Sequence, residues 1–274
     1  MHAFASFNQK IHSPDEIKLS AVSSAALYGR GVFTTVAVYA GKPFLWEKHW
    51  RRLIENAGKA GLNLSEFSEE KVKKSFSEAI IKNELKNGRA RLTFFDESAS
   101  GVWSFETNNK ASLLITTANF RETKDMNLTV SPYPINSKSP LAGVKSCNYL
   151  ENLLALDGAK RRGFDEAIRL NEKEEIVSAS MANIFWIKDE KIFTPALETG
   201  CLAGTTREFL TESFSVLEVK AKINEICEAD EIFLTSAGIG IGKVGRFEEK
   251  ILESKITGAI FDKAFPFHQS FFQD

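Results

Sequence analysis

Short runs of hydrophobic residues separated by turn signals dominate the chain, and this pattern predicts many strands and few long helices. Residues 32–39 are rich in β-branched and aromatic side chains and predict a strand, with residues 44–46 as its hairpin partner after a Gly-Lys-Pro turn. Residues 49–60 and 68–86 place apolar side chains three and four apart, which predicts two helices. Two further strands are predicted, at residues 89–95 and 112–118.

The second half of the chain continues with more strands than helices. The predicted strands are 128–133, 166–170, 175–177, 184–188, 191–194 and 231–235, and the predicted helices are about 148–161, 206–213 and 222–227. Strands and helices are segregated along the chain instead of alternating regularly, which favours an α+β fold in two domains. We place the first domain at residues 1–118, a polar linker at 119–127 and the second domain at 128–274.

Composition narrows the classes of protein that this chain could represent. Its 274 residues are 43% hydrophobic and 26% charged, with a formal net charge of −1, which is typical of a globular protein. A near-neutral charge argues against nucleic-acid and membrane-surface partners. Three cysteines without metal-ligand spacing, and an N-terminus unlike a signal peptide, predict a reduced, cytoplasmic protein. No arrangement of histidines predicts a metal site or a Ser/His/Asp triad.

The candidate chemistry is organised around Lys145, in Leu141-Ala-Gly-Val-Lys145-Ser-Cys-Asn148. A lysine held in an apolar pocket loses hydration, its pKa falls, and its amine becomes a nucleophile or general base. The run after it, with Leu150, Leu153 and Leu154, has the spacing of an apolar helix face. A lysine at the start of a helix is more often simply solvated.

Two further motifs suit an anionic ligand. The segment Leu202-Ala-Gly204-Thr205-Thr206-Arg207 is a small-residue loop that opens a predicted helix, and a helix start binds phosphate through its backbone N–H groups. Ordinary N-capping by a threonine explains the same residues. Arg52 lies on the predicted helix 49–60 and could clamp a phosphate, or be a solvated surface charge.

A third motif, Gly240-Ile-Gly242-Lys-Val-Gly245, matches the dinucleotide-binding fingerprint. It lies near the end of the chain, where no room remains for the βαβ unit that the fingerprint requires. We therefore interpret these glycines as shaping a loop.

Taken together in order, these motifs resemble the class IV (fold type IV) pyridoxal-phosphate enzymes. The resemblance rests on Tyr28-Gly-x-Gly-Val-Phe33, His49-x-x-Arg52-Leu53, Lys145-x-x-Asn148, Ala182-Asn183-Ile-Phe185 and Leu202-x-Gly204-x-Thr206-Arg207. The family includes branched-chain and D-amino-acid aminotransferases and 4-amino-4-deoxychorismate lyases. Within it, Phe33-Thr34-Thr35 and Ala182-Asn183-Ile184-Phe185-Trp186 most resemble the lyases. The resemblance implies a small N-terminal α/β domain, a larger barrel-like C-terminal domain, a homodimer and pyridoxal 5′-phosphate as cofactor.

The resemblance also implies roles for individual residues. Lys145 would be the catalytic residue and would hold the cofactor as a Schiff base. The implied cofactor-binding residues are Arg52, Tyr149, Ser178, Thr205, Thr206 and Ser236, with Arg52, the 205–206 backbone and Ser236 on the phosphate side. For the amino substrate we expect contacts from Arg30, Thr34, Thr35 and Arg91.

The sequence departs from the family at Ser178. Family members carry a glutamate five residues before the asparagine that Asn183 matches, and this glutamate bonds the pyridine nitrogen. A hydroxyl at that position keeps the nitrogen protonated less well, which weakens the electron sink. A second departure is Phe94-Phe95-Asp96-Glu97, where relatives often carry Arg-Gly.

Three functions follow from these observations. The first is a 4-amino-4-deoxychorismate lyase that releases 4-aminobenzoate and pyruvate. The second is an aminotransferase for D- or branched-chain amino acids, and the third is a catalytically idle member of the fold. Ser178 favours the lyase over the aminotransferase, because transamination stores charge in the ring across two half-reactions.

Overall fold

The computed structural model describes residues 1–99, 110–120 and 125–253. The chain divides into two compact units, Met1–Phe120 with Val144–Asn148, and Arg121–Gly143 with Tyr149–Asp274. The predicted linker at 119–127 contains the division, although residues 121–124 lie outside the described residues. The short segment Val144–Asn148, which we placed in the second domain, packs with the first unit.

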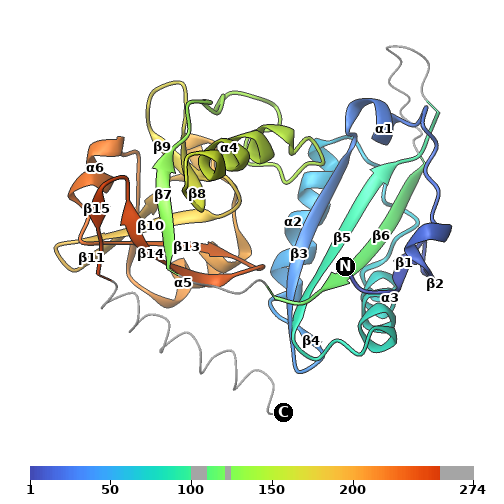
Figure 1. The fold of residues 1–274 in the computed structure, drawn as a ribbon. Coiled ribbons are helices and arrows are strands. Elements are labelled where there is room, and N and C mark those ends of the chain that lie inside the picture. Colours follow the sequence, from blue (N-terminus) through green and yellow to red (C-terminus); the bar gives the residue numbers. More distant parts are fainter. Residues whose placement is uncertain (100–109, 121–124, 254–274) are drawn as a thin grey trace. The chain divides into compact units, whose positions relative to one another are not determined.

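The first unit is a six-stranded sheet with helices (Figure 1). The strand order is β2-β1-β6-β5-β3-β4, and every neighbouring pair is antiparallel. Its elements are β1 (Ala5–Phe7), β2 (Lys10–His12), η1 (Pro14–Glu16), α1 (Ser24–Tyr28), β3 (Gly31–Tyr39), β4 (Lys42–Pro43), α2 (Trp46–Lys59), α3 (Glu69–Lys82), β5 (Gly88–Asp96) and β6 (Ala111–Ala118).

Helices α2 and α3 form the core of this unit with one face of the sheet. Leu53 and Ala57 of α2 and Phe76 of α3 are buried against Val32, Val36 and Val38 of β3 and further apolar residues of β5 and β6. Side chains of a strand alternate between its faces, so the neighbours Phe33 and Thr35 belong to the opposite face. The helices therefore cover one face of the sheet, and Phe33 and Thr35 lie on the other face.

The second unit is built on a larger sheet, in the order β12-β11-β10-β13-β14-β7-β8-β9, with β15 paired to β14. Its elements are β7 (Met126–Val130), α4 (Leu150–Arg161), β8 (Glu166–Leu170), β9 (Ile176–Ala179), β10 (Asn183–Lys188), β11 (Lys191–Pro195), η2 (Leu197–Thr199), α5 (Thr205–Ser213), β12 (Val216–Val219), α6 (Ile223–Glu228), β13 (Glu231–Ser236), β14 (Gly240–Phe247) and β15 (Lys250–Ile251). Strand β9 also contacts β10 and β11, so the sheet curls on itself around a core that includes Trp186, Ile232 and Leu234. The predicted α+β fold with a barrel-like second domain is confirmed.

The predicted hairpin partner at residues 44–46 is wrong. The strand that forms a hairpin with β3 is β4, Lys42–Pro43, and α2 already begins at Trp46. Leu45 adopts a left-handed conformation with φ of 55°, which ends the extended run and turns the chain into the helix. The aromatic residues that predicted a strand are buried instead as part of the turn and the helix start.

The prediction of a loop at residues 240–245 is also wrong, because these residues belong to strand β14. It pairs with β13 on one side and with β7 on the other. A side chain at Gly242 would place its Cβ 2.6 Å from the Cε atom of Met126, so the flexible end of Met126 would have to move to make room for it. Glycines that suggested a loop instead allow tight packing within a sheet.

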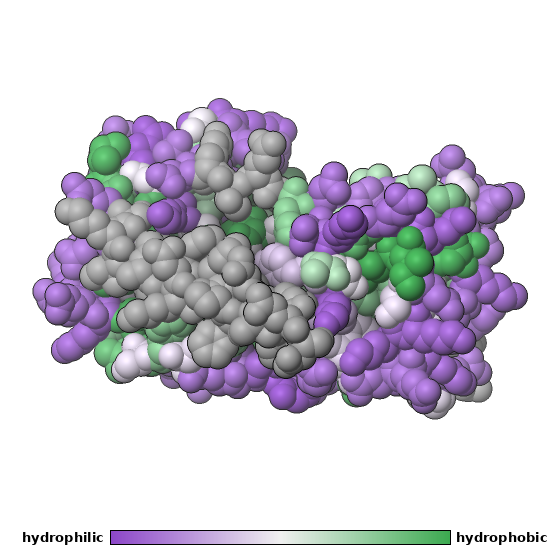
Figure 2. All heavy atoms as spheres, turned by 90° about the horizontal axis from the view of Figure 1, so that it is seen from below, coloured by the Kyte–Doolittle hydropathy of each residue, from purple (hydrophilic) through white to green (hydrophobic). Residues whose placement is uncertain are grey.

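The apolar face predicted for the helix after Lys145 is largely exposed in the single chain. Leu150, Leu153 and Leu154 of α4 are 66%, 48% and 50% exposed, whereas Ala155 and Ala159 are buried. Hydrophilic residues dominate the face of the molecule in Figure 2, with hydrophobic residues in smaller groups. Among the helices of the described residues, none has the length and apolar character needed to cross a membrane.

Candidate active site

Lys145 is positioned by pairing between its own segment and the start of β3. The Phe33 N–H donates to the Lys145 carbonyl at 2.9 Å, and the Cys147 N–H donates to the Gly31 carbonyl at 2.8 Å. Asn148 adds a side-chain bond, from its Nδ2 to the Gly29 carbonyl at 3.2 Å. Two motifs that are more than a hundred residues apart in sequence are thus joined as neighbouring extended segments of the first unit.

Lys145 and Arg91 both lie over the ring of Phe33. The Lys145 Nζ atom is 4.6 Å from the ring centroid, and the Arg91 guanidinium carbon is 3.6 Å from it. Burial, reinforced by the positive charges of Arg52 and Arg91, lowers the pKa of Lys145 to about 7. The ammonium ion loses hydration there and is repelled by its neighbours, so the lysine gives up its proton near neutral pH. This is the property that a nucleophilic or proton-accepting lysine needs.

Arg52 is held by a buried chain of polar side chains on the helix-facing side of β3. Its Nη2 donates to the Thr34 hydroxyl at 2.9 Å, and this hydroxyl lies 2.7 Å from His49 Nδ1. Burial, together with the charges of Arg52 and Lys145, holds the pKa of His49 well below its usual range. We therefore assign a neutral imidazole that accepts the Thr34 proton. The sequence assigned His49 no role, and its bond to Thr34 could be found only from the structure.

Arg30 is engaged in the interior of the first unit. Its Nη1 lies 2.9 Å from an oxygen of Asp96, and its Nη2 donates to the Gly61 carbonyl at 2.7 Å. Both charged side chains are buried, and a buried pair of this kind is held by mutual neutralisation. These contacts do not favour the expected substrate role of Arg30. Thr34 is likewise occupied by Arg52 and His49, while Thr35 lies opposite Arg91 in the β3–β5 pairing.

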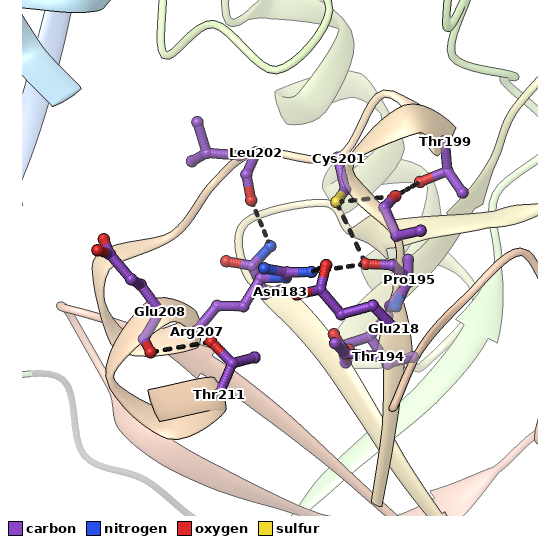
Figure 3. Close-up of polar contacts among 12 residues, drawn as sticks. Asn183, Thr194, Pro195, Thr199, Cys201, Leu202, Arg207, Glu208, Thr211 and Glu218 are labelled. Carbon is purple, nitrogen blue, oxygen red and sulfur yellow. Dashed lines mark hydrogen bonds and ion pairs between the residues drawn. The ribbon is translucent and has the colours of Figure 1, made fainter. Parts of the chain in front are cut away.

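In the second unit, Asn183 joins two of the motifs found in the sequence. Its Nδ2 donates to the Leu202 carbonyl at 2.8 Å, at the loop that leads into α5 (Figure 3). A Cβ on Gly204 would lie 1.9 Å from the Asn183 Oδ1 atom, so a larger residue cannot stand there without displacing Asn183. The small-residue loop is therefore fixed by the strand β10 that carries Asn183.

The start of α5 presents the residues expected at a phosphate. Thr205 and Thr206 are its first two residues and both are buried. The N–H groups of a first helical turn have no acceptor within the helix and bind anions well. Arg207 is committed elsewhere, since its Nη2 donates to the Pro195 carbonyl and the Glu218 carboxylate (Figure 3). Ser236 ends β13, where its hydroxyl accepts the Gly238 N–H at 3.3 Å.

Ser178 lies in β9, just before a loop that a buried carboxylate shapes. Glu166 accepts the N–H groups of Ser180 and Met181 at 3.0 and 3.1 Å, and that of Ala167 at 3.0 Å. Burial raises the pKa of Glu166, and these hydrogen bonds oppose the rise. The carboxylate is used to hold the backbone of the loop, so it is not a substitute for the glutamate missing at Ser178.

Arg169, which the sequence did not single out, lies directly opposite Ser178 in the β8–β9 pairing. Its side chain is fully buried, and its Nε donates to the Tyr133 carbonyl at 3.0 Å. The signal that could have revealed it is an arginine within the predicted strand 166–170, whose neighbours are apolar. Within the described residues, no group of three or more His, Cys, Asp or Glu side chains could hold a metal ion.

The residues around Lys145 in the first unit and those around the start of α5 in the second unit each fit a part of pyridoxal phosphate. In the first, an amine that titrates near neutral pH suits a carbonyl group, and two nearby arginines suit an anion. In the second, the α5 start offers backbone N–H donors for a phosphate. Neither set contains chemistry that would oppose such a ligand.

Comparison with known proteins places the chain in a family. Residues 31–247 match the family described as amino-transferase class IV. A putative branched-chain-amino-acid aminotransferase of Methanocaldococcus jannaschii is 26% identical over 269 residues, covering 93% of this chain and 92% of the relative. The aminodeoxychorismate lyase of Bacillus subtilis is 28% identical over 241 residues, covering 84% and 82%. The crystal structure of a putative 4-amino-4-deoxychorismate lyase from Legionella pneumophila is 26% identical, with a TM-score of 0.83 over 92% of this chain and 96% of that one.

The chain belongs to the class IV aminotransferases. The match covers the motifs of both units, from the start of β3 to the end of β14. Members of this class are enzymes that use pyridoxal phosphate, and this chain is one of them. Its relatives include lyases, branched-chain aminotransferases and D-alanine aminotransferases, so the family defines the cofactor but neither the reaction nor the substrate.

Proposed function

We propose that this protein is a 4-amino-4-deoxychorismate lyase, which converts its substrate to 4-aminobenzoate and pyruvate. The observation that carries the proposal is Ser178, at the position where the family has a carboxylate. Without a negative charge there, the cofactor ring accepts electrons less strongly. The lyase reaction tolerates this better than transamination does, because formation of an aromatic ring drives it and no second substrate is needed. The lyases among the relatives agree with the proposal.

In the proposed reaction, Lys145 is the catalytic residue. Pyridoxal phosphate, when bound, supplies an electrophilic carbonyl carbon and an electron-accepting ring. Lys145 would attach the cofactor through its Nζ and, once released by the amino substrate, would accept the proton from the carbon that bears the amino group. The same nitrogen, now protonated, can return a proton to the departing three-carbon group, which leaves as pyruvate. A pKa of about 7 suits both directions of this transfer.

The other expected residues position ligands in this proposal. Arg52, fixed through Thr34 and His49, and the 205–206 backbone would bind the phosphate, with Ser236 beside it and Tyr149 near the ring. Arg91 is the better candidate for a substrate carboxylate, since Arg30 is neutralised by Asp96. Thr35 would line the substrate site beside Arg91.

The test is to supply aminodeoxychorismate to the purified protein loaded with pyridoxal phosphate, and to measure 4-aminobenzoate and pyruvate. We expect both products in equal amounts, and none from Lys145→Ala. A parallel assay offers a panel of D- and branched-chain amino acids and follows conversion of the cofactor to its amine form. That conversion, with no 4-aminobenzoate from the first assay, would establish the aminotransferase instead. Loaded protein inactive in both assays would establish the idle fold.

We also propose that the chain forms a homodimer that covers the exposed leucines of α4. Leu150, Leu153 and Leu154 are three and four residues apart, so they form one exposed apolar stripe.

We expect Leu153→Glu/Leu154→Glu to weaken dimerisation by at least about tenfold, because each charge would be buried against apolar surface. Sedimentation velocity over a range of concentrations measures this. Glu151→Gln on the same helix is the control, and a wild-type chain that stays monomeric at high concentration would contradict the proposal.

A further inference from the structure

Arg169 combines three properties that a purely structural arginine in a strand does not need. Its side chain is fully buried, it lies in β8 among apolar neighbours, and within the described residues its Nη2 atom has no hydrogen-bond partner. The nearest acidic group to Nη2 is the largely exposed Glu151, whose oxygen is 3.7 Å away and outside hydrogen-bond range. A buried, permanently charged group with one donor unused is costly unless something occupies that donor.

The position of Arg169 is set by three different parts of the second unit. Nε donates to the Tyr133 carbonyl at 3.0 Å in the segment after β7, and Nη1 is 3.4 Å from the Asn152 side-chain oxygen on α4. Asn152 in turn donates to the Ser180 carbonyl at 2.7 Å, in the loop that follows β9. The guanidinium is therefore held between β8, α4 and the 178–183 loop, and it has little freedom to move away.

Ser178 shares this location. Residues directly opposite in an antiparallel pair project from the same face of the sheet, and Arg169 and Ser178 are such a pair. The phenol of Tyr149, at the N-terminal end of α4, is close enough to act electrostatically on the guanidinium. Two residues expected at the cofactor ring, Ser178 and Tyr149, thus both lie near one buried cation.

We propose that Arg169 faces the ring nitrogen of bound pyridoxal phosphate, directly or through the Ser178 hydroxyl, and keeps that nitrogen unprotonated. A guanidinium has only N–H donors, so the nitrogen beside it must offer its lone pair. A fixed positive charge at that site also opposes a second one on the ring. Arg169 is then a positioning residue. It places a positive charge beside the ring nitrogen, where the family has the negative charge of a carboxylate. This inference rests on the proposed function for the placement of the cofactor.

The decisive experiment measures the ring nitrogen itself. Protein loaded with cofactor labelled with nitrogen-15 in the ring is examined by NMR at pH 7. We expect the chemical shift of an unprotonated nitrogen in the wild type, and that of a protonated nitrogen in Arg169→Met/Ser178→Glu, which restores the family's carboxylate. A protonated nitrogen in the wild type would overturn the proposal, whatever the variants do.

A binding experiment tests the same proposal without spectroscopy of the ring. N-methylated pyridoxal phosphate carries a permanent positive charge at this nitrogen, so we expect the wild type to bind it at least about tenfold more weakly than the normal cofactor. Arg169→Met should reduce this ratio, and Arg169→Lys should retain most of it. A merely structural Arg169 would weaken both ligands equally and leave the ratio unchanged, which would refute the proposal. Arg161→Met, at an exposed arginine of α4, is the matched control.

The outcomes separate this inference from the proposed function. Cofactor bound with a protonated ring nitrogen would reject the role of Arg169 and leave the lyase proposal standing. An unprotonated nitrogen in a protein that makes no 4-aminobenzoate would support Arg169 and reject the lyase. Failure to bind either form of the cofactor would contradict both.

Discussion

Each unit buries a cationic side chain, Lys145 in the first and Arg169 in the second, and burial has a different consequence for the charge of each. In the first unit it lowers the pKa of Lys145 to about 7, with help from Arg52 and Arg91. In the second unit it lowers the pKa of Arg169, and the negative charge of Glu151 acts in the opposite direction. The ordinary pKa of arginine is so high that Arg169 keeps its charge, whereas Lys145 can lose its proton near neutral pH.

The difference shows why the two residue types stand where they do. A residue that must give and take a proton needs a pKa near the working pH, which burial can achieve for an amine. A residue that must supply a constant field needs a charge that burial cannot remove, which is the property of a guanidinium. The same desolvation therefore produces a proton carrier in one unit and a fixed charge in the other.

Replacing the lysine of the first unit by an arginine should have the largest effect on turnover. Lys145→Arg keeps a positive charge but cannot accept a proton, so we expect turnover to fall by about 10⁴-fold. Steady-state kinetics with aminodeoxychorismate, the proposed substrate, measure the change, and circular dichroism checks the fold. An enzyme that keeps more than a few per cent of its activity would show that Lys145 is not the base.

The substitution Arg30→Leu tests the role of a buried cation that is neutralised by the Asp96 carboxylate. Because it leaves Asp96 charged and buried, we expect a loss of about 3–5 kcal/mol in the free energy of unfolding. Urea denaturation measures it, and Arg30→Leu/Asp96→Leu should recover much of the loss. A stable Arg30→Leu protein with a raised KM would instead support the expected contact between Arg30 and the substrate.

Removing one of the charges that act on Lys145 should have a smaller effect. Arg91→Met should raise the Lys145 pKa by about one unit, because a repelling cation is lost while burial remains. The amine form is the reactive one, so the rate of covalent cofactor capture should rise with pH through about 7 in the wild type and level off above it. In Arg91→Met the midpoint should move to higher pH, with Lys10→Met as the exposed control. An unchanged midpoint would mean that burial and Arg52 set the Lys145 pKa without a contribution from Arg91.

Local sequence determined much of the fold. The β-branched and aromatic residues of β3 and the helical spacing of α2 and α3 predicted these elements, because their apolar side chains are buried in the core and the local pattern records this. The predictions failed where contacts distant in sequence decide. Gly242 belongs to a strand because β14 pairs with β13 and β7, and Trp46 begins a helix after Leu45 turns the chain in a left-handed conformation.

For the candidate site, the sequence by itself determined which residues carry chemistry. Lys145, Arg52, Thr205 and Thr206 were named from their motifs, and Ser178 was found as a departure from the family. The tertiary structure alone decided their surroundings: that His49 and Thr34 hold Arg52, that Asp96 occupies Arg30, and that Arg169 lies opposite Ser178. The physical reason is that pKa values and charge pairing depend on burial and on neighbours many residues away, and no local pattern records either.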